Sequence, residues 1–173
     1  MKKLFLLAAI ALTLSCCNKD DDHTESLPPA TQTGAGTFAC KVNGTSYIDT
    51  SGGYFNCFYQ LVDGDYYFGI GGNDDNHDLF SIIKLASNAS IIEEGMQYTL
   101  TCNELQNHYG EVAFVDLLLN ATSCNTSFGS MTITKLDFVN NIVSGTFEFD
   151  IVHPNTGETI QIREGRFDTL FTQ

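Results

Sequence analysis

Short runs of alternating apolar and polar residues, each followed by a turn-forming pair, dominate the chain from residue 37 onward. In residues 37–42, for example, Phe38, Cys40 and Val42 share one face, and Asn43-Gly44 follows at once. Asn-Gly is the strongest short signal for a hairpin turn, because both of its residues accept a positive φ. No segment shows a helical period of useful length, so the pattern favours a fold made of strands.

About ten short strands are expected, with turn signals at fairly regular intervals. After the first strand they cover residues 45–48, 54–62, 66–70, 79–85, 96–102, 111–119, 131–136, 142–152, 159–163 and 166–171. Residues 111–119 are more continuously apolar and indicate a buried central strand, with a short helix as the alternative. The pattern predicts a single all-β domain over residues 37–173, either an antiparallel β-sandwich, which we favour, or a partly closed barrel.

The start of the chain has the features of a lipoprotein signal peptide. Lys2 and Lys3 precede an apolar run over residues 4–14, which is too short to span a bilayer because a spanning helix needs about 20 residues. We expect residues 1–16 to be removed and Cys17 to become the lipidated N-terminus, because Leu14 stands three residues before it. Cys16, which follows a small Ser15, is the alternative. Two or more acyl chains on this cysteine would anchor the protein stably in a membrane.

Residues 17–36 are expected to form a flexible tether behind the lipid. They carry proline, glycine, serine and threonine and almost no large apolar side chains. Residues 18–22, Asn-Lys-Asp-Asp-Asp, resemble the acidic export tag of surface lipoproteins of the Bacteroidetes, with a plain solvated spacer as the alternative. The expected location is the cell envelope, as an outer-membrane lipoprotein that is either surface-exposed or inward-facing.

The charge of the chain narrows the range of partners. Loss of Lys2 and Lys3 leaves 6 basic and 21 acidic residues, a net charge of −15. This charge repels nucleic acid and anionic membrane surfaces but leaves cationic partners and calcium open. We expect no cofactor. Beyond the lipid anchor, a glycan or another envelope protein is the expected partner.

Four cysteines follow the signal region: Cys40, Cys57, Cys102 and Cys124. An exported chain meets an oxidising compartment, so disulfides are expected to be possible. Four cysteines allow three pairings, and we weakly prefer the sequence-near pairs 40–57 and 102–124. The alternative is buried free thiols, which pack like small apolar side chains.

An oxygen-rich segment suggests a weak calcium site with Asp74, Asp75 and Asp78 as the candidate ligands, since calcium takes six to eight oxygen atoms. Asp63 and Asp65 lie nearby in sequence, but they are expected at the opposite end of the intervening strand. The segment lacks the twelve-residue loop of an EF-hand. Solvated turn residues are therefore the favoured interpretation.

Aromatic residues fill two adjacent expected strands and give the main candidates for ligand binding: Tyr54, Phe58, Tyr59, Tyr66 and Tyr67. Strand alternation places Tyr54, Asn56, Phe58 and Gln60 on one face and Phe55, Cys57, Tyr59 and Leu61 on the other. Rings beside polar amides on a solvent-exposed face could stack on sugars. The alternative is that these rings belong to the core, where aromatic residues of strands are common.

No catalytic arrangement is recognised. Ser81 and Lys84 match the spacing of a Ser-x-x-Lys motif, but that chemistry requires a helix, and here the two residues fall on opposite faces of a strand. His77, His108 and His153 stand alone in expected turns. The prediction is a non-catalytic binding or interaction module. The alternatives are a structural envelope subunit or a hydrolase with an unrecognised site.

Three stretches, residues 36–44, 142–149 and 156–168, together resemble a family of Bacteroidetes lipoproteins of unknown function, the DUF6252 family. The similarity covers most of residues 36–170. Tyr47 stands where the family often has an aromatic residue, frequently tryptophan. The resemblance implies a location in the cell envelope and an all-β fold. It gives no catalytic residues that could be assigned to this chain.

Overall fold

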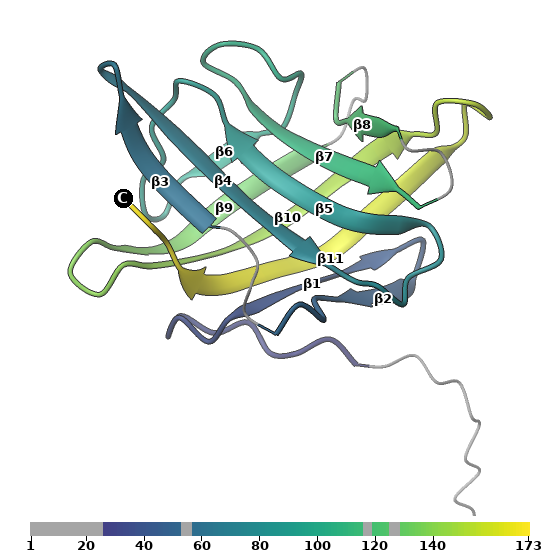
Figure 1. Ribbon diagram of the computed structural model, residues 1–173, viewed down its shortest axis with the longest axis horizontal. Coiled ribbons are helices and arrows are strands. Elements are labelled where there is room, and N and C mark those ends of the chain that lie inside the picture. The colour runs from purple at the N-terminus through teal and green to yellow at the C-terminus, as the bar shows by residue number, and fades with distance from the viewer. Residues whose placement is uncertain (1–25, 53–56, 116–118, 125–128) are drawn as a thin grey trace, which may run out of the picture.

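The computed structural model describes residues 26–52, 57–115, 119–124 and 129–173, and every regular element in these ranges is a β-strand (Figure 1). Cys16, Cys17 and Tyr54 lie outside the described residues. The strands are β1 Thr37–Val42, β2 Thr45–Ile48, β3 Cys57–Val62, β4 Asp65–Asn73, β5 Phe80–Ser87, β6 Gln97–Thr99, β7 His108–Phe114, β8 Asn120–Thr122, β9 Gly129–Asp137, β10 Ile142–Val152 and β11 Thr159–Leu170. The described part of the chain contains no helix long and apolar enough to cross a membrane.

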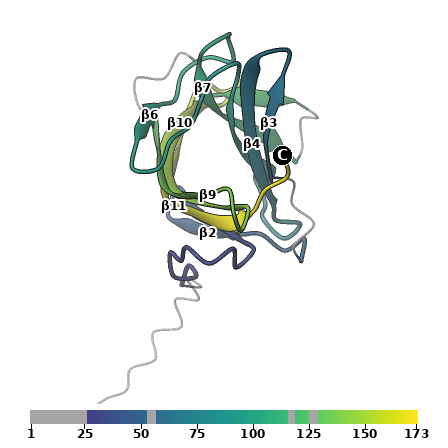
Figure 2. The ribbon, with the colours of Figure 1, turned by 90° about the vertical axis from the view of Figure 1, so that its left-hand side faces the viewer.

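The strands form two antiparallel sheets that face each other, as Figure 2 shows end on. The six-stranded sheet has the order β2-β1-β11-β10-β9-β6, and the five-stranded sheet has the order β3-β4-β5-β7-β8. The all-β prediction is therefore confirmed, and the arrangement is the sandwich rather than the barrel. The C-terminal residues join the sheets at one edge, where the Tyr59 amide donates to the Thr172 carbonyl over 2.8 Å.

Phenylalanine side chains fill the space between the sheets. Phe38, Phe149 and Phe167 of the six-stranded sheet and Phe68 and Phe80 of the five-stranded sheet are almost fully buried. The Phe68 and Phe167 rings meet across the two sheets, with centroids 6.3 Å apart. Aromatic rings remove large apolar areas from water, and this burial supplies most of the driving force for stacking the sheets.

One predicted turn is a bulge instead. Residues 159–163 and 166–171 were expected to be two strands joined at Glu164-Gly165, but they form the single strand β11. Glu164 has a φ of 53°, and the pairing register shifts beside it on both neighbouring strands. A β-bulge and a tight turn both need a residue at positive φ, so the local sequence does not separate them.

The cysteine prediction is half right. Cys102 and Cys124 form a disulfide, whereas Cys40 and Cys57 are buried free thiols. The 40–57 pair is wrong: Cys40 on β1 and Cys57 on β3 lie in different sheets, and no disulfide joins these two residues. Burial raises the pKa of both thiols well above the usual range, so they behave as apolar core residues.

The segment before β1 is bound to the outer face of the six-stranded sheet through the buried carboxylate of Asp168 on β11. Its hydrogen-bond donors, at distances of 2.6–3.3 Å, are Ser144 Oγ, Thr31 Oγ1, Thr33 Oγ1 and the amides of Thr33, Gly34 and Ala35. Burial alone would raise the pKa of Asp168, but these hydrogen bonds hold it far below its usual value. The prediction of a flexible tether up to residue 36 is therefore corrected for residues 31–35.

Candidate ligand-binding site

The outer face of the five-stranded sheet carries one of the aromatic residues predicted for binding. Phe58 is half-buried on this face, whereas its neighbours Cys57 and Tyr59 point into the core. Gln60 follows Phe58 on the same face, as the alternation predicts. The two expected faces of this strand are therefore present, and the face with Phe58 and Gln60 is the outer one.

A groove of about 540 Å³ crosses this outer face, and we call it the outer-face groove. Its lining residues are Ser51, Phe58, Gly69, Ile70, Gly71, Asn73, Ile82, Lys84, Leu85, Ala86, Tyr109 and Glu111. They come mainly from β3, β4, β5 and β7, so the groove is built on paired strands. Such a scaffold positions side chains more firmly than a loop does.

Four of these residues face one another in succession across the strands. Phe58 pairs with Gly69, Gly69 pairs with Ala86, and Ala86 pairs with Tyr109. We call this set, Phe58, Gly69, Ala86 and Tyr109, the aromatic row. It places an aromatic ring on each side of two residues with almost no side chain.

Glycines on β4 make room for the side chains that line the groove. A Cβ atom at Gly69 would lie 2.6 Å from Cε1 and Cζ of Phe58, so the ring occupies the space above this residue. A Cβ atom at Gly71 would lie 2.9 Å from Cγ of Lys84, whose stem crosses the same strand. The missing side chains therefore let neighbouring residues lean over β4 and line the groove.

The polar part of the groove centres on Glu111. Its Oε1 atom lies 3.9 Å from Nζ of Lys84 and accepts a 2.7 Å hydrogen bond from Nδ2 of Asn120. Burial, and then the charge of Glu111, raise the pKa of the neighbouring Tyr109, so its hydroxyl stays protonated at neutral pH. The groove thus offers a cation, a carboxylate and a phenol beside its apolar surfaces.

The other predicted aromatic residues that the structure describes, Tyr59, Tyr66 and Tyr67, do not line the outer-face groove. Tyr59 is only 5% exposed on the inner face of β3, and its hydroxyl bonds to the backbone of Ile92, so it lies outside the outer-face groove and lines a separate one. Tyr66 is half-buried and packs against Tyr59 with ring centroids 5.1 Å apart. Tyr67 is half-buried opposite Gln60, on the outer face but outside the groove lining.

Tyr109, Glu111 and Lys84 were not predicted as site residues. Residues 111–119 were interpreted as a buried strand, whereas β7 ends at Phe114 and has one face outside the core. The signal that could have revealed them is the strict alternation from His108 onward, in which Tyr109 and Glu111 share the outer face.

The three weak calcium candidates, Asp74, Asp75 and Asp78, differ in their surroundings. The Asp74 carboxylate is buried and accepts hydrogen bonds from the amides of Ile48 (3.2 Å) and Asn76 (3.0 Å), whereas Asp75 and Asp78 are more exposed. Among the residues that the structure describes, no three histidine, cysteine or acidic side chains are arranged to hold a metal. Asp74 instead ties β2 to the β4–β5 connection.

Comparisons of the chain with protein-family models, with curated proteins and with solved structures found no match. The outer-face groove combines aromatic, apolar and charged side chains on one sheet, and it is the basis of the function proposed below.

Proposed function

We propose that the protein is a lipid-anchored, non-catalytic binding module of the cell envelope that holds a linear, uncharged glycan in the outer-face groove. The aromatic row is the observation that carries this proposal. Sugar rings have apolar faces that stack on aromatic side chains and hydroxyl groups that need polar partners. The groove supplies both kinds of surface on one rigid sheet.

The length of the aromatic row suits a chain rather than a single sugar. The Phe58 ring lies over Gly69 on β4, so about two strand spacings of about 4.8 Å each, on the order of 10 Å, separate it from Tyr109 on β7. One pyranose unit of an extended chain is about as long as one strand spacing. A chain laid across the strands would therefore contact the Phe58 ring with one unit and Tyr109 with the second unit beyond it, while the unit between passes over Ala86.

The charges in the groove favour a neutral ligand. Lys84 and Glu111 lie close enough to balance each other, so the groove has no surplus charge from this pair. Both side chains can still exchange hydrogen bonds with hydroxyl groups, Lys84 as donor and Glu111 as acceptor. An acidic glycan would also be repelled by the formal net charge of −13.

The same residues support binding over hydrolysis. Cleavage of a glycosidic bond ordinarily uses a pair of carboxyl groups on either side of the bond. Glu111 is the one carboxylate in the lining of the outer-face groove as described, and it is engaged by Lys84 and Asn120.

Calorimetric titration of the unlipidated mature chain, residues 18–173, with β-1,4- and α-1,4-linked glucose oligosaccharides of increasing length tests the proposal. Affinity should rise until the oligosaccharide reaches about three units, the length that spans two strand spacings, and then level off. Phe58→Ala and Tyr109→Ala should each weaken binding by at least about 1 kcal/mol. Phe138→Ala, a change at an exposed ring outside the groove, is the matched control. The same affinity for Phe58→Ala and the unaltered chain would refute the proposed site.

A further inference from the structure

A second surface lies at one end of the sandwich, where the tip of the β9–β10 hairpin lies beside the C-terminus (Figure 1). We call it the hairpin end and define it by the exposed apolar residues Ile91, Phe138 and Val139. Val139 is 91% exposed and Phe138 is 53% exposed. Grouped apolar exposure of this kind is typical of interaction sites, whereas single exposed apolar residues need no explanation.

A groove of about 380 Å³ enters the sandwich here, separate from the outer-face groove. Tyr66, Ile91, Leu136 and Phe138 contribute its apolar surface, and Glu93 and Glu94 contribute carboxylates. Beneath it the Phe138 ring lies 5.9 Å from that of Tyr59 and 5.8 Å from that of Phe171. The groove therefore has a firm aromatic floor.

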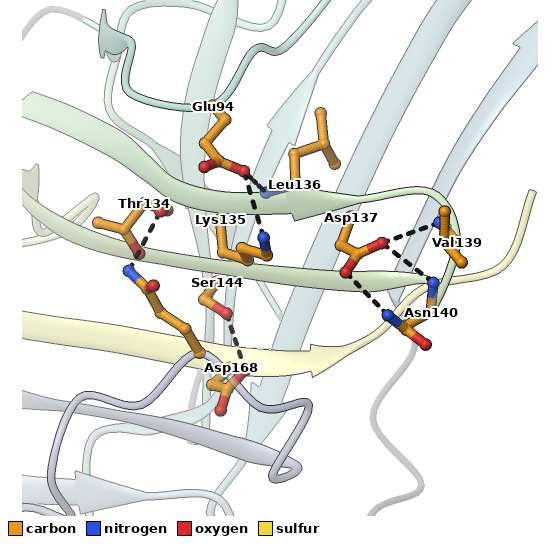
Figure 3. A network of polar contacts seen from close by, with 10 residues as sticks. Glu94, Thr134, Lys135, Leu136, Asp137, Val139, Asn140, Ser144 and Asp168 are labelled. Carbon is orange, nitrogen blue, oxygen red and sulfur yellow. Dashed lines mark hydrogen bonds and ion pairs between the residues drawn. The ribbon is translucent and has the colours of Figure 1, made fainter.

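The exposed hairpin tip is held in place by its own hydrogen bonds. The Asp137 carboxylate accepts hydrogen bonds from the amides of Val139 (2.9 Å) and Asn140 (3.1 Å) and from the Asn140 side chain (2.9 Å), as Figure 3 shows. Gln173 at the C-terminus donates a 2.8 Å hydrogen bond to Asn141. Phe138 and Val139 are thus presented in a fixed geometry without being covered.

The charge around the groove is acidic. Lys135 lies 3.9 Å from Glu94 (Figure 3), and its charge also acts on Asp137, so among the described residues this one cation is outnumbered by the carboxylates of Glu93, Glu94 and Asp137. Hydrogen bonds from Asn140 and Val139 lower the pKa of Asp137, so it stays ionised. A second copy of this chain or an anionic lipid surface would bring negative charge to a negative surface, and like charges disfavour such contacts.

We propose that the hairpin end binds a basic, amphipathic segment of a partner protein. Apolar side chains of that segment enter the groove between Ile91 and Phe138, and its lysine or arginine side chains face Glu93 and Asp137. This proposal does not depend on a glycan in the outer-face groove, because the two surfaces share no lining residue.

Fluorescence anisotropy of a labelled eight-residue peptide of alternating leucine and lysine, titrated with the unlipidated mature chain, tests this proposal. An otherwise identical leucine–glutamate peptide should show at least tenfold weaker binding. The paired change Phe138→Ser and Val139→Ser should weaken binding of the basic peptide at least fivefold, and Glu93→Gln should weaken it and reduce its salt dependence. Both tip residues are largely exposed, so the pair should leave folding intact, which circular dichroism verifies.

The matched control is Glu104→Gln with Leu105→Ser on the β6–β7 connection, where Leu105 is 73% exposed. This pair should change affinity less than twofold. An equal loss in the control would show general charge attraction to an acidic protein and would overturn the proposal. So would a dimer seen by sedimentation that the tip variant abolishes, or flotation with neutral phosphatidylcholine vesicles that the tip variant abolishes, because each would identify a different occupant.

Discussion

The Phe58 ring fills the space directly above Gly69, its partner on the neighbouring strand. Alanine in place of glycine ordinarily stabilises a strand slightly, by about 0.5–1 kcal/mol. Here the added Cβ would lie 2.6 Å from two ring atoms, which is closer than carbon atoms can pack. This contact with the Phe58 ring therefore makes Gly69→Ala destabilising instead of stabilising.

Gly69→Ala should lower the free energy of unfolding by about 1–3 kcal/mol, the usual cost of overpacking. It should also weaken ligand binding in the outer-face groove, since the Phe58 ring must move. Urea denaturation of a double-mutant cycle checks the cause. In the Phe58→Ala background, Gly69→Ala should be neutral or stabilising, and an equal loss in both backgrounds would exclude the ring as the cause.

Asp168→Asn should lower the free energy of unfolding by at least about 2 kcal/mol, because hydrogen bonds to a buried charge are weakened or lost. Limited proteolysis should then cut residues 28–35 faster than in the unaltered chain. Asp137→Asn, at a carboxylate that accepts hydrogen bonds within the β9–β10 turn, is the control and should leave these sites protected. Unchanged cleavage in Asp168→Asn would mean that the carboxylate does not hold the linker.

Asp168 also predicts acid sensitivity. Its pKa is lower in the folded chain than the value of about 3.9 expected when unfolded, so its contribution is complete above that pH. This contribution is lost as the pH falls below about 4 toward the folded-state pKa. Urea midpoints measured between pH 7 and pH 2 should therefore fall more steeply for the unaltered chain than for Asp168→Asn.

His108 predicts a second pH dependence at higher pH. It is 8% exposed, its ring centroid lies 4.2 Å from that of Tyr98, and its Nε2 atom has no hydrogen-bond partner among the residues that the structure describes. Burial lowers its pKa, so only the unfolded chain takes up a proton as the pH first falls below about 6.5, and stability decreases. His108→Phe should remove this loss between pH 7 and pH 5, as followed by thermal unfolding. His153→Phe, at a more exposed histidine, should retain it.

Reduction of the Cys102–Cys124 disulfide, whose cysteines are 22 residues apart in sequence, should lower the free energy of unfolding by about 3 kcal/mol. A chain starting at residue 18 should show no reactive thiol when folded and two, Cys40 and Cys57, when unfolded. Thiol titration with and without guanidinium checks both numbers. Four thiols in the unfolded, non-reduced chain would contradict the disulfide.

Fatty-acid labelling in cells tests the anchor. The unaltered chain should incorporate label and sediment with membranes. The double change Cys16→Ala and Cys17→Ala should abolish both, and each single change shows which cysteine carries the lipid. Label retained by the double variant would contradict a lipoprotein signal.

The alternation of β3 predicted which residues share a face but not which face meets water. Phe58 and Tyr59 are both aromatic, and Tyr59 is the more polar, yet the stacking of the second sheet buries Tyr59. Glu164-Gly165 could equally form a turn or a bulge, and the pairing of β11 with strands on both sides decides it. Local sequence fixes periodicity and turn chemistry, whereas faces and bulges depend on contacts between residues far apart in the chain.

The aromatic row illustrates the same limit for the site. Phe58 was expected from its strand, but Tyr109 enters the groove only because β7 lies two strands beyond β4 in the sheet. The order of strands is a tertiary property, so a set of residues drawn from four strands has no signature in any single segment.

The hydrogen bonds between residues 31–35 and Asp168 fix the point at which the N-terminal segment is attached to the domain. A domain on a long flexible tether rotates freely, so its binding surface has no preferred direction. Here the N-terminal segment is attached to the outer face of the six-stranded sheet through Asp168. If Cys17 carries the proposed lipid, the membrane pulls on this face, and the outer-face groove lies on the opposite sheet, where a distant polymer can reach it.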